Sequence, residues 1–158
     1  MCWRTQWYQY LGEHVVLTPH IGEMSRLSGR TIQEIQHEIA DTALKCAAET
    51  GSVCVLKDAC TVIADEKGQM YLNLSGNSGM ATAGSGDVLS GILAAVLCMY
   101  LKTEEQPPMV LKAALGVYLL AAVLLLAAAE KGKRSMLAGD IIEYLPKALA
   151  IGEEESEL

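Results

Sequence analysis

The stretch Gly76-Asn77-Ser78-Gly79-Met80-Ala81-Thr82-Ala83-Gly84-Ser85-Gly86-Asp87 decides the fold that we expect of this chain. It contains four glycines and leads directly into an apolar run over residues 88–101. A glycine-rich loop before a helix leaves the first amides of that helix without internal acceptors, at the positive end of the helix dipole. The pattern therefore predicts a cradle for a phosphate group.

Asp87 does not suit a loop that only binds anions. A carboxylate repels bound phosphate unless a metal ion or a transferable proton compensates, so Asp87 is a candidate for a chemical role. A purely structural alternative stays open, because tight turns need glycine and an aspartate at a helix start is often only an N-cap.

Composition bounds the class of protein. The chain has 158 residues, 51% of them apolar, which is enough for one globular domain with a sizeable core. The net charge of −7 argues against general affinity for nucleic acid or for an anionic membrane. The five cysteines are odd in number and show no C-x-x-C spacing, so we expect reduced thiols and a cytoplasmic protein. Residues 1–10 lack the apolar segment of a signal peptide.

Residues 113–129 carry no charge and raise the question of a membrane span. A spanning helix needs about 20 apolar residues, and alanine, frequent here, contributes little to insertion. A helix that is apolar all round also suits the core of a soluble protein. We therefore expect buried helices and no membrane insertion.

The remaining sequence alternates between the two periods of secondary structure. Short β-branched runs predict strands at residues 13–17, 52–56, 61–64 and 69–73, with a turn at residues 65–68. Helices are predicted at residues 20–27, 31–50, 88–101, 109–130 and 140–149. This order is typical of an α/β fold with helices on both faces of a sheet.

The helix over residues 31–50 has clear end signals. Thr31 and Glu34 form a capping box, and Gly51 stands where a left-handed C-cap would end the helix. We expect one continuous helix that buries a single stripe of residues: Ile32, Ile35, Ile39, Ala43 and Cys46.

Five segments occur together in one order and spacing. They are Thr18-Pro19-His20-Ile21-Gly22-Glu23-Met24, residues 56–64, residues 76–87, Leu115-Gly116-Val117-Tyr118-Leu119 and residues 138–149. Together they resemble the ADP/ATP-dependent NAD(P)H-hydrate dehydratases of the ribokinase-like carbohydrate kinase superfamily. The resemblance covers roughly residues 15–150, and residues 77–87 are its most specific part.

The resemblance implies a ribokinase-like α/β sheet and a repair lyase. Such an enzyme removes water from 6-hydroxylated NADH or NADPH, using ADP or ATP with Mg²⁺, because phosphate leaves more readily than hydroxide. It implies that Asp87 is the catalytic base and contacts the substrate, and that His20 binds the substrate. The amides of Gly84, Ser85 and Gly86 would form the anion hole.

The resemblance also assigns a nucleotide-binding set, which comprises Lys57, Asp58, Ala59, Cys60, Thr61 and Gly86. The family usually reads Lys-Gly-Ala-Gly-Thr in the first segment, so Asp58 and Cys60 replace both glycines. Side chains there would crowd the nucleotide, and Asp58 would add negative charge. We expect weakened nucleotide affinity.

The chain also departs from the family at larger scale. The family's domain is much longer, so we expect residues 1–150 to be a partial domain that lacks the N-terminal half, followed by an acidic, disordered tail at 151–158. Residues 1–10 match nothing in the family pattern. Leucine replaces the family's polar residues at 120–126, and the resulting apolar surface predicts a homo-oligomer, with a tetramer as one possibility.

Two other functions stay open. The chain could be a truncated, inactive ribokinase-like module that binds nucleotide without turnover. A related vitamin or sugar kinase would also fit the glycine loop and Asp87, but it fits residues 77–82 less well.

Overall fold

The computed structural model describes residue 8 and residues 10–75, 83–102, 104, 106–132 and 137–154. The strands are β1 (Val16–Leu17), β2 (Val53–Leu56), β3 (Thr61–Ala64) and β4 (Met70–Asn73). The helices are α1 (Ile21–Ser28), α2 (Ile32–His37), α3 (Ile39–Thr50), α4 (Ser85–Met99), α5 (Met109–Lys131) and α6 (Ala138–Glu154), with a 3₁₀ turn, η3, at Tyr100–Lys102. The predicted α/β class is confirmed, and the order of strands and helices matches the expectation except that one predicted helix is divided in two.

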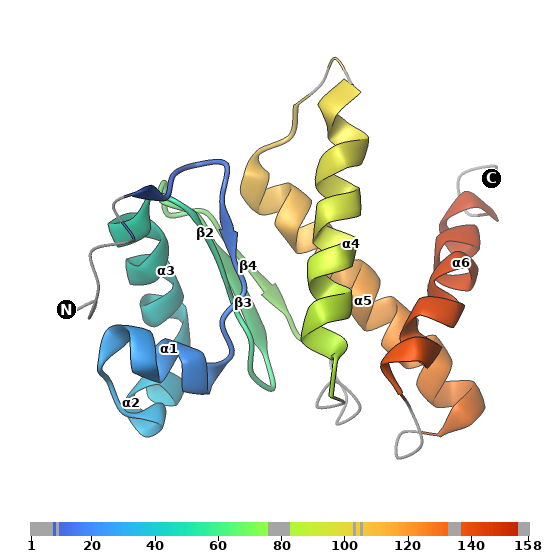
Figure 1. Cartoon of the computed structure of the whole chain (residues 1–158), viewed down its shortest axis with the longest axis horizontal. Helices are drawn as coiled ribbons and strands as arrows, with labels where there is room; N and C mark the ends of the chain where they lie inside the picture. The colour runs from blue at the N-terminus through green and yellow to red at the C-terminus, as the bar shows by residue number, and fades with distance from the viewer. Residues whose placement is uncertain are drawn as a thin grey trace.

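The four strands form one mixed sheet in the order β1-β2-β3-β4. β1 and β2 are parallel and are joined through α1, α2 and α3, whereas β2, β3 and β4 form antiparallel hairpins. Figure 1 shows α1–α3 on one side of the sheet and α4–α6 on the other. The parallel pair matters for function, because the carboxyl ends of parallel strands meet at one edge of a sheet.

Alternation along β2 and β3 divides the core in two. Val53, Val55 and Ile63 join the core beneath α4, α5 and α6. Cys54 and Val62 join the core beneath α1–α3. The central strands β2 and β3 are therefore buried on both faces, which explains why they read as continuous apolar runs, whereas most of β4 is exposed.

The segment predicted as one helix at residues 31–50 is two helices. The capping box at Thr31 and the left-handed Gly51 are confirmed, but the backbone breaks at Glu38, at φ −126° and ψ 43°. Arg30 spans the break, since its guanidinium donates to the Glu34 carbonyl, the Glu38 carboxylate and the Thr42 hydroxyl.

The predicted stripe also needs one correction. Ile32 is 48% exposed, whereas Ile35, Ala43 and Cys46 are buried. The predicted stripe therefore fails at Ile32 in the first turn of α2, whereas Ile35, Ala43 and Cys46 keep it and Ile39 is partly buried.

α5 is the central helix of the second layer. It contacts β2, β3 and β4 on one side and α4 and α6 on others. By length and composition it could cross a membrane, and half of its most apolar window is buried inside the fold.

α6 is fastened to the end of α5 by one polar cluster. The Tyr144 hydroxyl donates to Glu130 at 2.7 Å, and the Lys147 ammonium lies 3.1 Å from the other Glu130 oxygen and 4.4 Å from the Tyr144 ring centre. The hydrogen bond from Tyr144, and then that from Lys147, lowers the pKa of Glu130 below its ordinary value. The helical backbone continues through Glu154 and so includes the first residues of the predicted tail, while residues 155–158 lie outside the described part.

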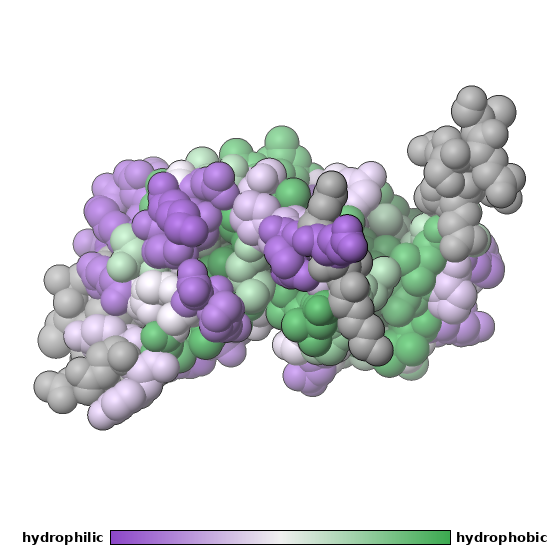
Figure 2. All heavy atoms as spheres, turned by 90° about the horizontal axis from the view of Figure 1, so that it is seen from above, coloured by the Kyte–Doolittle hydropathy of each residue, from purple (hydrophilic) through white to green (hydrophobic). Residues whose placement is uncertain are grey.

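Apolar side chains remain exposed over the helical half. Figure 2 shows much of the hydrophobic surface seen from above over α4–α6, and more hydrophilic residues over α1–α3. On α5 the large exposed apolar residues lie on one face of the helix, at spacings of four, three and seven residues. They are Leu111, Leu115, Tyr118 and Leu125.

The contact between α4 and α5 gives a stability prediction. A Cβ added at Gly116 would lie 2.7 Å from Cδ2 of Leu93, which is itself buried. We expect Gly116→Ala to lower the free energy of unfolding by about 1 kcal/mol, because overpacking costs about 1–3 kcal/mol and alanine's helix propensity returns about 1 kcal/mol. Urea denaturation measures the change.

Gly91→Ala is the matched control for this prediction. Gly91 lies on α4 with no atom within 4 Å of an added Cβ. Only the propensity term applies, so we expect stability to rise by about 0.5–1 kcal/mol. A Gly116→Ala protein that gains as much stability as Gly91→Ala would contradict the close contact.

Candidate functional site

The site begins where β1 and β2 end. β1 pairs with β2 in parallel, and a further bridge joins His20 to Lys57. The Lys57 amide donates to the Pro19 carbonyl at 2.9 Å. Two segments predicted separately from the sequence thus leave the sheet side by side at one edge.

His20 caps the helix that follows it. Its Nδ1 accepts from the amides of Gly22 and Glu23 at 3.0 and 3.2 Å, and its own amide donates to the Glu23 carboxylate at 2.8 Å. Since Nδ1 is an acceptor, this hydrogen-bond pattern assigns the ring proton to Nε2. Nε2 lies 3.3 Å from the second Glu23 oxygen, and the His20 side chain is about half exposed.

Lys57 points toward the glycine loop. Its ammonium lies 3.4 Å from the position that a Cβ would take at Gly86. Across the described parts of the chain this ammonium has neither an ion pair nor a hydrogen bond. An unpaired cation beside a helix start is suited to an anion.

The glycine loop enters α4 at Gly84, and residues 76–82 lie outside the described residues. Gly84 is the N-cap, at φ +88°, and a Cβ there would also lie 3.0 Å from Cβ of Ala138 at the start of α6. Both the backbone angle and the close approach require glycine at this position.

Asp87 lies one turn further than expected. α4 begins at Ser85, so Asp87 is an exposed residue of the first turn and not the N-cap. Its amide donates to the Gly84 carbonyl at 3.1 Å, and among the described residues its carboxylate makes no capping hydrogen bond. The first-turn position still stabilises a negative charge through the helix dipole.

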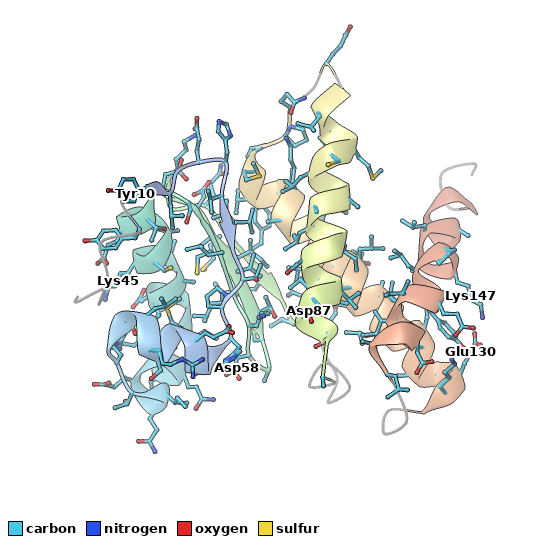
Figure 3. The ribbon with its side chains drawn as sticks, viewed as in Figure 1. Tyr10, Lys45, Asp58, Asp87, Glu130 and Lys147 are labelled. Carbon is cyan, nitrogen blue, oxygen red and sulfur yellow. The ribbon has the colours of Figure 1, made fainter. Side chains whose placement is uncertain are left out.

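One cleft of about 1140 Å³ brings these segments together. Nearly every predicted site residue lines it: His20, Lys57, Asp58, Ala59, Thr61, Gly84, Ser85, Gly86 and Asp87. Cys60 is the one predicted site residue that does not line the cleft. Figure 3 shows Asp58 at the sheet side and Asp87 at the start of α4, on facing sides of this space.

The cleft also contains residues that the sequence analysis did not select. Glu23, Arg26 and Leu27 come from α1, and Ser90, Val117 and Leu120 come from α4 and α5. The spacing His20-x-x-Glu23 could have been recognised as a capping box. Val117 and Leu120 carry no chemical signal, and only the packing of α5 brings them to the cleft.

Asp58 lines the cleft at a position where the resembled family usually has glycine, and its carboxylate accepts a hydrogen bond from a residue outside the cleft. Gln36 Nε2 on α2 donates to its carboxylate at 3.3 Å. Within the described residues, no group of three or more His, Cys, Asp and Glu side chains could hold a metal ion. The carboxylates of the cleft are therefore separate and do not form a metal cage.

Known proteins resemble this chain in sequence over most of its length. A family model described as NAD(P)H-hydrate dehydratase matches residues 3–147, so the match includes most of the segment at residues 1–10 that had no family counterpart in the sequence analysis. A bifunctional NAD(P)H-hydrate repair enzyme of Moorella thermoacetica is 49% identical over 148 residues, covering 92% of this chain and 27% of that protein.

Two solved structures share the fold. The ADP/ATP-dependent NAD(P)H-hydrate dehydratase of Bacillus subtilis, co-crystallised with ATP and Mg²⁺, superposes with a TM-score of 0.76 at 37% identity, over 86% of this chain and 47% of that one. A ribokinase-like superfamily protein of Enterococcus faecalis superposes with a TM-score of 0.64 at 29% identity, over 87% of this chain and 45% of that one.

These matches cover most of this chain but only part of each relative. The chain spans 27% of the Moorella enzyme and about half of the Bacillus structure. The predicted ribokinase-like sheet with flanking helices is nevertheless confirmed, and by the family match and this fold the chain belongs to the NAD(P)H-hydrate dehydratase family.

Proposed function

We propose that this chain carries the catalytic cleft of an ADP- or ATP-dependent NAD(P)H-hydrate dehydratase. The observation that carries the proposal is the convergence of His20, Lys57, Gly86 and Asp87 on one cleft from three separate parts of the sequence. The substrate would be the 6-hydroxylated form of NADH or NADPH. We further propose a cytoplasmic location, in keeping with the free thiols of Cys46, Cys54, Cys60 and Cys98.

The nucleotide phosphates would lie between Lys57 and the start of α4. The amides of Gly84, Ser85 and Gly86, together with the Lys57 ammonium, supply positive charge that a protein of net charge −7 otherwise lacks. Mg²⁺ fits this site as a companion of the phosphates, because the cleft offers separate carboxylates and this ion commonly takes its ligands from phosphate and water. The Bacillus relative was crystallised with ATP and Mg²⁺.

Asp87 would act as the general base. When bound, the nucleotide supplies the phosphoryl group that turns a poor leaving hydroxide into phosphate. Asp87 would accept the proton of the ring hydroxyl as the hydroxyl oxygen bonds to the terminal phosphorus, and the bond from that phosphorus to the bridging oxygen would break, releasing ADP from ATP or AMP from ADP. The carbon–oxygen bond of the ring would then break with its electrons going to the departing phosphate, the ring nitrogen would supply an electron pair, and loss of the proton on the neighbouring ring carbon to water would restore the dihydropyridine.

His20 would bind the nicotinamide end of the substrate. With Nδ1 committed to two backbone amides, the ring offers an Nε2–H donor in a fixed orientation. A hydrogen-bond donor suits an amide or hydroxyl oxygen, and the fixed ring limits the freedom lost on binding.

The first test is Asp87→Asn. We expect wild type to regenerate the reduced-nicotinamide absorbance from hydrated NADH with ADP or ATP and Mg²⁺. The variant should lose about 10²–10⁴-fold in kcat, because it cannot take the proton. ATP affinity measured by calorimetry serves as the control and should be kept or rise severalfold, since asparagine keeps the shape and removes one negative charge from the cleft.

Two results would count against this mechanism. Equal activity of both proteins would remove Asp87 from the role of base. If neither protein regenerates the cofactor, this chain is the inactive nucleotide-binding module and not an enzyme.

The second test concerns nucleotide affinity. We expect Asp58→Gly to tighten ATP binding by about three- to tenfold, because it removes a negative charge from the cleft that receives the phosphates. Cys60→Gly is the matched control and should change affinity little, since Cys60 does not line the cleft. Calorimetry in low and moderate salt measures both, and an unchanged or weaker affinity in Asp58→Gly would show that this carboxylate does not face the phosphates.

We also propose that copies of this chain associate through the exposed face of α5. Leu111, Leu115, Tyr118 and Leu125 form an apolar stripe on a helix without charges from residue 113 to residue 129. Two copies of a protein with net charge −7 repel each other elsewhere, whereas this face can meet its own copy without ionic repulsion.

Light scattering during size-exclusion chromatography tests this association. We expect a multimer for wild type, with a dimer or tetramer both consistent, and a smaller species for Leu115→Glu with Tyr118→Glu. Ile142→Glu, which alters an exposed apolar residue of α6 outside the stripe, should leave the mass unchanged. A monomeric wild type would contradict the proposal.

A further inference from the structure

α1 forms one wall of the cleft with a single face of the helix. His20, Glu23, Arg26 and Leu27 recur at helical spacing, and all four line the cleft. The opposite face is fixed in the core through Ile21, Met24 and Ser28. These buried residues therefore fix which face of α1 is turned toward the cleft.

Arg26 is an exposed cation on this wall. In the part of the chain that the structure describes, its guanidinium has no ion pair and no hydrogen bond. Glu23, three residues before it, would be the natural partner on a helix. Both Glu23 oxygens instead face His20, at 2.8 Å from its amide and 3.3 Å from Nε2.

Arg30 provides a contrast, because its guanidinium has a structural role. Its guanidinium is 2.7 Å from the Glu38 carboxylate and 3.0 Å from the Thr42 hydroxyl. Among the described residues Arg26 has no comparable contacts, although it stands in a protein with an excess of acidic residues. Among the cleft residues, it and Lys57 are the two cations.

The two cations lie at different places along the site. Lys57 faces Gly86 and the start of α4. Arg26 follows His20 by six residues, which is about 9 Å along a helix axis. If His20 holds the nicotinamide end, the helix wall leads from it toward Arg26, and in a dinucleotide one ribose separates the nicotinamide from the diphosphate.

We propose that Arg26 binds a phosphate group of the dinucleotide substrate and is a substrate-binding residue of this site. Arginine is suited to this task because its planar fork forms two parallel hydrogen bonds with phosphate oxygens. The inference rests on the proposed function, since it takes His20 as the contact for nicotinamide. A merely structural role exists as an alternative, because Arg26 in the last turn of α1 also complements the helix dipole.

Calorimetry on three variants separates the two roles. The probes are NADH, NADPH and ATP, and the variants are Arg26→Gln, Arg26→Lys and Lys45→Gln. Lys45 is an exposed lysine of α3 that lies far from Asp87, so it controls for the loss of one positive charge (Figure 3). Thermal melting of each variant records any effect on α1.

We expect Arg26→Gln to weaken dinucleotide binding about ten- to a hundredfold, as the loss of charge-assisted hydrogen bonds does. Arg26→Lys should recover part of the affinity, and ATP binding and Lys45→Gln should stay at wild-type values. An equal loss for NADH and NADPH identifies the diphosphate, and a loss for NADPH alone identifies the 2′-phosphate.

Other outcomes overturn the proposal. Wild-type dinucleotide affinity in Arg26→Gln, with or without a lower melting temperature, leaves Arg26 a structural residue while the proposed function stands. A loss of ATP affinity in place of dinucleotide affinity assigns Arg26 to the other ligand. A wild-type chain that binds neither NADH nor NADPH overturns the proposed function together with this inference.

Discussion

The parallel pairing of β1 with β2 is the interaction on which the whole site depends. β1 is only two residues long, yet its register against β2 continues through the His20–Lys57 bridge and the hydrogen bond from Lys57 to Pro19. That register delivers the cap of α1 and the loop after β2 to one edge of the sheet. Residues of both segments line the same cleft as a result.

The second layer sets the other side of the cleft. α5 lies on the sheet and holds α4 through the contact of Gly116 with Leu93, so the start of α4 is fixed relative to the end of β2. α6 continues this support, because Ala138 packs against Gly84 while Tyr144 and Lys147 fasten the helix to Glu130. The packing of α4, α5 and α6 therefore holds the backbone at Gly84, the end of the loop that would stabilise the transferred phosphoryl group.

The cleft carries positive groups although the protein as a whole is negatively charged. The chain is strongly acidic, but the cleft combines a helix N-terminus with Lys57 and Arg26, neither of which is paired in the described structure. Asp58 and Asp87 lie in the same cleft, and one is held by Gln36 while the other is exposed in the first turn of α4. An acidic surface with a local cationic site favours small phosphorylated ligands over polyanions, which bind extended basic surfaces.

Features that depend on a few neighbouring residues could be predicted from the amino-acid sequence. The capping box at Thr31, the left-handed Gly51, the turn at residues 65–68 and the start of α5 at Met109 follow from local hydrogen bonds and backbone preferences, and the structure has them all. Almost all of the site residues that the family motifs predicted line the cleft. Packing between distant segments accounts for four features that the sequence did not predict: the break at Glu38, the exposure of Ile32, the position of Cys60 outside the cleft, and the close approach of Lys57 to Gly86. These depend on groups far apart in the chain, which local propensity cannot register because their positions follow from how the helices pack on the sheet.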